Sequence, residues 1–200
     1  MKIDSQNIHF ISDLHVGHFN VIKFDNRPFK DLNEMHSTII QNWNSVVDDE
    51  DIVFYLGDLF YKCNAKYPTW FVHQLKGKIH FVLGNHDRIN EIKKMNRFET
   101  ISPEIQIQVK DIDAKGGYQH IHMHHHPILS WNKATHGSFH LHGHVHHKMS
   151  TNKDWDWFYN RKVMDVGCNG LNYTPISYNQ VKSIMNNKSN LPKGEKFEDV

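Results

Sequence analysis

The segment DIVFYLGDLFYKCNAKYPTWFVHQLKGKIHFVLGNHD (residues 51–87) carries the clearest indication of fold class in this sequence. Its apolar run at 51–58 predicts a buried strand, the segment 67–75 predicts a short helix opened by a proline, and KIHFVL at 78–83 predicts another strand. A strand, a helix and a strand in this order are typical of parallel strands joined by a crossover helix. The stretch therefore predicts an α/β protein.

The chain on the N-terminal side extends this pattern. IHFIS at 8–12 predicts a first strand, and apolar residues then recur close to helical spacing at Met35, Ile39, Ile40, Trp43 and Val47. A helix with such an apolar face is expected to lie on the sheet. Strands and helices therefore alternate from residue 8 to residue 87.

The C-terminal half predicts a second sheet. Four segments have the pattern of shorter strands separated by turn residues: ISPEIQIQVK (101–110), GYQHIHMHHHP (117–127), SFHLHGHVHH (138–147) and KVMDVG (162–167). Residues 176–187 predict a closing helix. We expect two sheets packed face to face with helices outside, in a single domain over residues 1–186, and a charged, flexible C-terminal tail over 187–200.

Composition limits the possible functions. A chain of 200 residues can bury roughly 70% of its unfolded surface, so a metal is not needed to hold the fold together. The 23 Lys and Arg nearly balance the 22 Asp and Glu, which argues against an extended nucleic-acid footprint and leaves small nucleotides and short single strands as possible partners.

The sequence also bears on location. The first residues lack an apolar signal region, and no stretch approaches 18 consecutive apolar residues, so we expect a cytoplasmic protein without a membrane partner. Cys63 and Cys168 are too far apart for a zinc-binding pair and are expected to be reduced thiols.

Histidine is unusually frequent. The chain has 18 histidines, of which 11 lie between residues 120 and 147. A histidine-rich metal buffer is one explanation, but such tracts are low-complexity tails. These histidines lie within alternating, strand-like sequence, which favours a defined site.

Five polar clusters follow predicted strands. They are DLH (13–15), GD (57–58), GNH (84–86), HHHP (124–127) and GHVH (143–146). Ligands of open α/β sheets bind beyond the carboxyl ends of the strands, where such loops converge. Asp13 and His15 are two residues apart and would project to the same side of an extended chain, as would His144 and His146. Each cluster alone is compatible with a turn, but the five together predict a metal site.

The five clusters resemble the pattern of the calcineurin-like metallophosphoesterase family, which runs DxH, GD, GNH[DE], H and GHxH. All five blocks occur in order over residues 13–146. NVIKFDNRPF (20–29), NWN (42–44) and a DVG (165–167) followed by PIS resemble a subgroup of small phosphoesterases of bacteria and phages. The resemblance implies a four-layer αββα sandwich of two mixed sheets flanked by helices.

The resemblance also implies roles for single residues. One metal would be bound by Asp13, His15, Asp58 and His146, and the other by Asp58, Asn85, His125 and His144. His86 would donate a proton to the leaving oxygen, and Asp87 would orient His86. The family places its ligand two residues before proline, which selects His125, whereas the alternation of the strand favours His124. Strand ends often bulge, so we keep His125.

Three residues are candidates for substrate binding. Arg27 follows the DLH strand in a loop, and its guanidinium matches phosphate geometry. An equally good alternative is that Arg27 pairs with Asp25 or Asp31. His18 and Asn85 are further candidates for substrate contact.

The implied cofactors are two divalent transition-metal ions. Mixed imidazole and carboxylate ligands favour manganese, iron, nickel or zinc over magnesium or calcium, and we take manganese as the first choice. The implied reaction is hydrolysis of phosphate esters by a metal-activated hydroxide.

Sequence features that related enzymes have and this chain lacks narrow the expected substrate class. GDLFYKC (57–63) lacks the GDxxDRG block of protein phosphatases. The segment between Asp87 and residue 101 is short, so the site is expected to be open. This favours a phosphodiesterase for small or nucleotide substrates. The alternatives are a phosphomonoesterase, a dinucleotide pyrophosphohydrolase, and a catalytically silent protein-binding scaffold.

Overall fold

The computed structural model describes residues 1–4 and 7–192. These residues form two five-stranded sheets, whose strand orders are β10-β2-β3-β4-β5 and β1-β6-β7-β8-β9. We call them the first and the second sheet. The strands of the first sheet are β2 (Ile8–Ile11), β3 (Ile52–Tyr55), β4 (Lys78–Val82), β5 (Phe98–Ser102) and β10 (Ile176–Ser177). Those of the second are β1 (Lys2–Ile3), β6 (Glu104–Lys110), β7 (Tyr118–His124), β8 (Phe139–His142) and β9 (Val163–Asp165).

Helices connect and cover these strands. The α-helices are α1 (Phe19–Phe24), α2 (Leu32–Val46), α3 (Lys66–Val72), α4 (Ile89–Lys94), α5 (Asp156–Tyr159) and α6 (Tyr178–Asn186). Short 3-10 helices lie at Lys115–Gly117, Ala134–His136, Lys153–Trp155 and Cys168–Leu171. Within residues 1–4 and 7–192, the helices are too short or too polar to cross a membrane.

Both sheets are mixed. Strands β2 to β5 run parallel, as the alternation of strands and helices predicts, and β10 joins β2 antiparallel at one edge. In the second sheet β7, β8 and β9 run parallel, while β6 is antiparallel to β7. The predicted α/β class with two mixed sheets is confirmed.

The two sheets pack face to face across an apolar layer. Phe10 of β2 and Phe54 of β3 stack with 5.8 Å between ring centroids, and they belong to one buried cluster with Ile121 and Leu141 of the second sheet. Strand residues alternate between faces, so Tyr55, the neighbour of Phe54, points the other way.

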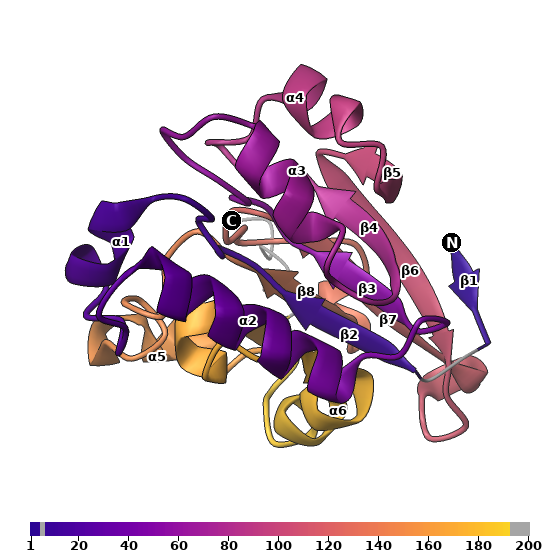
Figure 1. Ribbon diagram of the computed structural model, residues 1–200. Helices are drawn as coiled ribbons and strands as arrows, with labels where there is room; N and C mark the ends of the chain where they lie inside the picture. Colours follow the sequence, from indigo (N-terminus) through magenta and orange to yellow (C-terminus); the bar gives the residue numbers. More distant parts are fainter. Residues whose placement is uncertain (5–6, 193–200) are drawn as a thin grey trace.

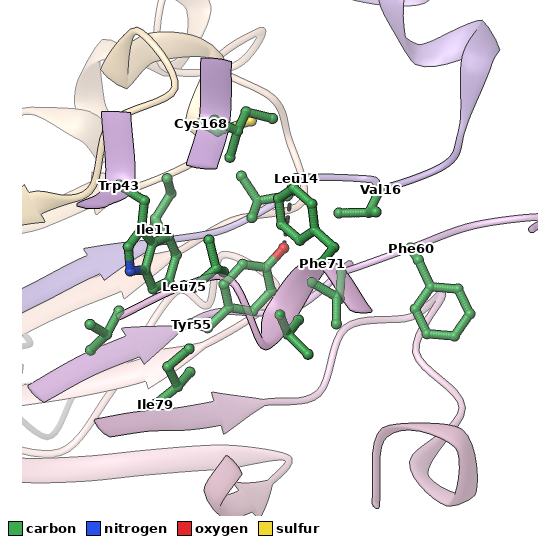
Figure 2. Packing of buried hydrophobic residues seen from close by; sticks show 14 of the residues in the cluster. Ile11, Leu14, Val16, Trp43, Tyr55, Phe60, Phe71, Leu75, Ile79 and Cys168 are labelled. Carbon is green, nitrogen blue, oxygen red and sulfur yellow. Dashed lines mark hydrogen bonds between the residues drawn. The ribbon is translucent and has the colours of Figure 1, made fainter. Parts of the chain in front are cut away.

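The opposite face of the first sheet is covered by α2 and α3, which lie in front of β2, β3 and β4 (Figure 1). Figure 2 shows Trp43 of α2 and Phe71 of α3 around Tyr55 in this second apolar layer. The apolar stripe predicted for 35–47 therefore forms the contact between α2 and the sheet. Short helical segments cover the outer face of the second sheet, through a cluster that contains Trp131 and Phe158.

The prediction of one continuous strand over residues 101–110 is wrong. Residues 101–110 do not form a single strand, because β5 ends at Ser102 and β6 begins at Glu104. Pro103 separates them, and proline has no N–H to donate to a sheet. The chain crosses here from the first sheet to the second, and only β6 shows the predicted alternation.

The C-terminal segment also departs from expectation. The closing helix begins at Tyr178, after Ser177, whose side chain forms a capping box with Gln180. Beyond it the chain is not loose at once: Ser189 forms a β-bridge with Arg161, and the Lys188 ammonium donates to the Val163 carbonyl at 2.5 Å. The rest of the predicted tail, residues 193–200, lies outside the described residues.

Candidate metal centre

The five polar clusters converge where strands of both sheets end. Asp13, Asp58 and Asn85 follow β2, β3 and β4 of the first sheet. His125 follows β7, and the GHVH cluster at 143–146 follows β8 of the second sheet. The site therefore spans the two sheets.

One group of ligand atoms comes from Asp13, His15 and His146, which lie within 4.8 Å of one another. The Nε2 atoms of His15 and His146 are 3.2 Å apart, and His146 Nε2 is 3.6 Å from Asp13 Oδ1. On the far side of the His146 ring, Nδ1 donates to Asp25 Oδ2 at 2.5 Å. That bond turns the Nε2 lone pair towards the other two residues.

A second group comes from His125, His126 and His144. His125 is fully buried, and its Nδ1 donates to the Leu56 carbonyl at 2.7 Å. Its Nε2 atom faces Asn85 Oδ1 at 3.1 Å. The ring of His144 lies 5.2 Å from that of His125, between centroids.

Asp58 lies between the two groups. Its Oδ2 atom is 3.7 Å from His15 Nε2 and 3.5 Å from His125 Nε2. Its Oδ1 atom accepts the backbone N–H of His86 at 3.0 Å. One carboxylate thus faces a histidine from each group.

The backbone at this site is strained. Asp13, His15, Asp58, His144 and His146 all have positive φ, at 60°, 51°, 57°, 71° and 48°. This conformation costs side-chain-bearing residues of order 1–3 kcal/mol each and clusters at functional sites. The extended-chain argument for these residues is wrong, since turns rather than strands aim them at one point.

Glycines permit the close approach of the clusters. A Cβ atom on Gly84 would lie 2.2 Å from Asp58 Oδ1, and one on Gly143 would lie 2.4 Å from Asp13 Oδ2. Neither distance is possible between real atoms, so glycine is required beside each carboxylate. The G in GNH and in GHVH therefore serves the packing of the site.

Burial and charge shift these groups in opposite directions. Burial raises the pKa of Asp13 to about 7 and holds the pKa of His15 well below its ordinary value. Burial would lower the pKa of His125 as well, but its interaction with Asp58 and the charge of Asp13 raise it to about 9. Burial and the neighbouring histidines lower the pKa of His144 to about 4. Opposed shifts in one cluster are typical of functional sites.

The donor set fits divalent cations. Since the Nδ1 atoms of His125 and His146 donate to oxygen atoms, a neutral ring in either case presents a lone pair at Nε2. These nitrogen lone pairs face carboxylate and amide oxygens. Nitrogen and oxygen lone pairs repel each other unless a proton or a cation lies between them. Imidazole with carboxylate suits first-row transition metals.

His86 lies at the open side of the cluster. Its side chain is 34% exposed, and its Nε2 atom is 3.9 Å from Asp58 Oδ2. The Tyr61 ring packs against it, with 4.2 Å between centroids. His86 lines two cavities, of about 360 Å³ and about 550 Å³.

Asp87 does not orient His86, contrary to the sequence-based expectation. Its carboxylate accepts the backbone N–H groups of Asp58 at 2.7 Å, Leu59 at 3.0 Å and Gly84 at 2.8 Å. Burial raises its pKa to about 6. Asp87 instead ties the loop after β3 to the loop after β4, and so positions Asp58.

Arg27 is not available to a substrate phosphate. It is buried, and its guanidinium donates to the carbonyls of Leu14 and Asp13, each at 2.9 Å. It also lies 3.6 Å from Asp25 Oδ2. The alternative of a structural partner is therefore the right one, with Asp25 as that partner, because the side chain of Asp31 caps α2.

The remaining candidates are placed as follows. His18 lines the larger cavity beside His15 and His86, so its role in substrate contact stays a prediction. His124 turns away from the cluster, with its Nδ1 against the backbone of His126. His125, the histidine that the sequence analysis kept, lies at the site.

Sequence reasoning missed three residues here. His126 belongs to the second ligand group, and the run HHHP was its signal. Asp25 holds His146, and Tyr61 packs on His86. No spacing pattern marks Asp25 and Tyr61, since both lie outside the helices and strands.

The structure is that of an α/β protein with two mixed sheets, in which the strand ends bring His and Asp side chains into a cluster that could hold metal ions. No family model matches the chain. It is 36% identical to the uncharacterized protein MJ1445 of Methanocaldococcus jannaschii over 183 residues, which cover 90% of this chain and 92% of that protein. The chain belongs to the same family as MJ1445.

Two further proteins are similar. The gene 66 protein of Mycobacterium phage L5 is 28% identical over 167 residues, covering 72% of this chain and 79% of the phage protein. The crystal structure of AQ665 from Aquifex aeolicus, a protein of unknown function, matches with a TM-score of 0.67 and 24% identity over 88% of this chain and 98% of that one. This match shows a shared fold.

Proposed function

We propose that this protein is a dinuclear metal-dependent phosphoesterase of the calcineurin-like type, with the four-layer αββα fold of that family. The observation that carries the proposal is Asp58, whose Oδ2 atom faces His15 at 3.7 Å and His125 at 3.5 Å. A carboxylate between two groups of nitrogen and oxygen donors is what a pair of ions requires.

The residues fit this assignment. One ion would be held by Asp13, His15, Asp58 and His146. The other would be held by Asp58, Asn85, His125 and His144, with His126 as a further neighbour. When bound, two such ions act as Lewis acids that lower the pKa of a water towards about 7 and offset phosphate charge. Manganese is the first choice among ions that accept this donor set.

His86 is the proposed proton donor. Its backbone N–H is anchored to Asp58, while its ring lies on the accessible side of the cluster. The ring can therefore reach a leaving oxygen and deliver a proton from Nε2. General acid catalysis of this kind contributes roughly 10²–10⁴ in rate.

Phosphodiesters are the proposed substrates. Two cavities meet at His86 and Tyr61, because both residues line each of them. The smaller cavity carries Lys62 and Arg88, and the larger one carries apolar side chains. A diester has two arms, and the site offers a separate space to each.

The test compares two esters. Protein stripped of metal and resupplied with Mn²⁺ is assayed on bis-p-nitrophenyl phosphate and on p-nitrophenyl phosphate. We expect faster cleavage of the diester, dependence on Mn²⁺, and a loss of roughly 10²–10⁴ in kcat for His86→Ala. His136→Ala is the matched control, since His136 is exposed, belongs to neither ligand group and lines neither cavity.

Each other outcome has a meaning. Faster cleavage of the monoester would replace the diesterase by a phosphomonoesterase. Two bound ions without turnover of either ester would favour a pyrophosphate substrate or a protein-binding scaffold. Failure to bind any first-row ion would overturn the proposal.

A further inference from the structure

The larger cavity joins the metal centre to helix α1. It measures about 550 Å³, within the usual range for small-molecule sites. At one end its wall is made of cluster residues, including His15, Asp58 and His144. The rest of its wall includes Phe24 of α1 and Met149 of the loop after β8, together with the ion pair of Asp25 and Lys148. A ligand that fills this space is anionic at the cluster and has an apolar part against Phe24 and Met149.

Four ring side chains of the cavity wall contact one another in series. Phe24 meets His18 edge to face, at 6.2 Å between centroids. His18 meets Tyr61 in the same way at 5.0 Å, and Tyr61 packs on His86 at 4.2 Å. Rings in contact thus connect α1 with the proposed proton donor.

Phe24 stands out within its helix. It is 64% exposed, although it lines a cavity that opens on polar ligands. Phe19, in the first turn of the same helix, is 61% exposed but does not line that cavity. Exposed aromatic side chains are ordinary on a protein surface. Of these two exposed rings, Phe24 and not Phe19 lines the cavity, so Phe24 is the one that can meet a ligand bound there.

We infer that this end of the cavity is a nucleobase subsite, and that the substrates are nucleotide phosphodiesters. The inference rests on the proposed phosphoesterase function, which places the phosphate at the cluster. A planar base fits a wall of rings whose edges also carry polar atoms, such as those of His18 and Tyr61, better than a hydrocarbon chain does. Bases stack on aromatic side chains whatever their identity.

The kinetic test uses two diesters with the same leaving group. Thymidine 5′-p-nitrophenyl phosphate carries a base, and methyl p-nitrophenyl phosphate does not. We expect kcat/KM for the thymidine ester to fall about ten-fold in Phe24→Ala, mainly through KM. The methyl ester should change less than two-fold. Phe19→Ala should leave both esters unchanged.

A binding test separates this inference from the proposed function. Calorimetry with the Mn²⁺-loaded protein compares adenosine 5′-monophosphate with ribose 5-phosphate, which has the same phosphate without the base. The subsite requires about ten-fold tighter binding of the adenosine compound, lost in Phe24→Ala and kept in Phe19→Ala.

Two results would overturn the subsite while leaving the phosphoesterase intact: equal binding of the two phosphates alongside diester turnover, or equal loss on both esters in Phe24→Ala. Base-selective binding without turnover of any ester would support the subsite and refute the proposed reaction.

Discussion

At the scale of single residues, the site depends on backbone conformations that its ligands would not adopt alone. Such strain persists only where the surroundings enforce it. Around Asp13 that enforcement is visible: the Tyr55 hydroxyl accepts the Leu14 N–H at 3.0 Å (Figure 2), and Arg27 donates to the carbonyls of Asp13 and Leu14. Tyr55 and Arg27 thus hold the backbone around Asp13 in place, although neither bonds to the Asp13 carboxylate that would bind a metal.

The assignment of His125 gives a first prediction. His125→Ala should remove one of two bound Mn²⁺ ions, because its Nε2 atom lies among the donors of the second group. His124→Ala should retain both, because His124 does not belong to either ligand group and its Nδ1 atom lies against the backbone of His126. The number of Mn²⁺ ions that each variant retains after dialysis, measured by elemental analysis, tests this assignment. Loss of an ion in His124→Ala alone would reverse the assignment.

Asp25 is expected to act through His146. The short bond between Asp25 Oδ2 and His146 Nδ1 sets the direction of the histidine Nε2 atom. Carboxylates behind ligating histidines typically contribute 10- to 100-fold in metal affinity. We predict that Asp25→Asn weakens binding of one ion by about this factor, measured by calorimetric titration with Mn²⁺.

The control for Asp25 is Asp49→Asn. Asp49 is exposed in the loop before β3, so this variant removes the same charge without touching His146. Unchanged affinity for both ions in Asp25→Asn would show that His146 is held by its backbone alone.

At the scale of elements, helix α2 and the loop after β2 are joined by a buried histidine. His36 of α2 accepts the Gly17 N–H at its Nε2 atom, at 3.1 Å. Its Nδ1 therefore carries the proton, which faces the Tyr67 hydroxyl of α3 at 2.8 Å. Burial, with a smaller contribution from the charge of Arg27, lowers the pKa of His36 to about 4.

This pKa predicts acid destabilisation. An unfolded histidine has a pKa near 6.5, so between pH 6.5 and pH 4 the unfolded chain binds a proton that the folded protein does not. The contribution of neutral His36 is therefore complete above pH 6.5 and is lost as the pH falls through this window. A depression of this size corresponds to about 2–4 kcal/mol.

His36→Gln isolates this contribution, because glutamine does not titrate. We expect the variant to be less stable than the wild type at pH 7, with the difference shrinking by about 2–4 kcal/mol at pH 4. Urea unfolding of metal-free protein at both pH values measures it. A stability difference that does not vary with pH would contradict the prediction, and His136→Gln should show no such change.

At the scale of the whole molecule, the metal centre lies across the contact between the sheets. Asp13, Asp58 and Asn85 belong to the first sheet, and His125, His144 and His146 to the second. Bound ions would connect the two, so they would stabilise the folded state against any unfolding that separates the sheets.

Removal of metal should therefore lower Tm. Ligand at 100 times its Kd stabilises by about 2.7 kcal/mol per site, and for chains of this size each kcal/mol corresponds to about 2–4 °C. We predict that Mn²⁺ raises Tm by roughly 10–20 °C over protein in EDTA, by scanning calorimetry. Asp58→Asn should lose most of the increase. Equal Tm values with and without saturating Mn²⁺ would contradict a centre that spans the sheets.

Much of the fold could be predicted because the pattern that marks each strand or helix lies within one short stretch of sequence. Periodicity is a local property, so β2, β3, β4 and α2 follow from runs of fewer than 20 residues. The exchange of sheets at Pro103 was not predictable in this way, since alternation looks the same in either sheet. Residues at the edges, such as those of β1 and β10, contribute strands of two residues each, too short for any periodic signal.

The α/β class and the set of donor residues could be read from the sequence, because strand ends and the residue types that follow them are local. Which of these donors meet depends on how the chain folds. The structure places Arg27 and Asp87 in supporting roles, and it adds Asp25 and His126 to the site. The reason is physical: each of those outcomes depends on contacts between segments, most of them far apart in the chain, and on turns with positive φ, which no pattern inside one segment encodes.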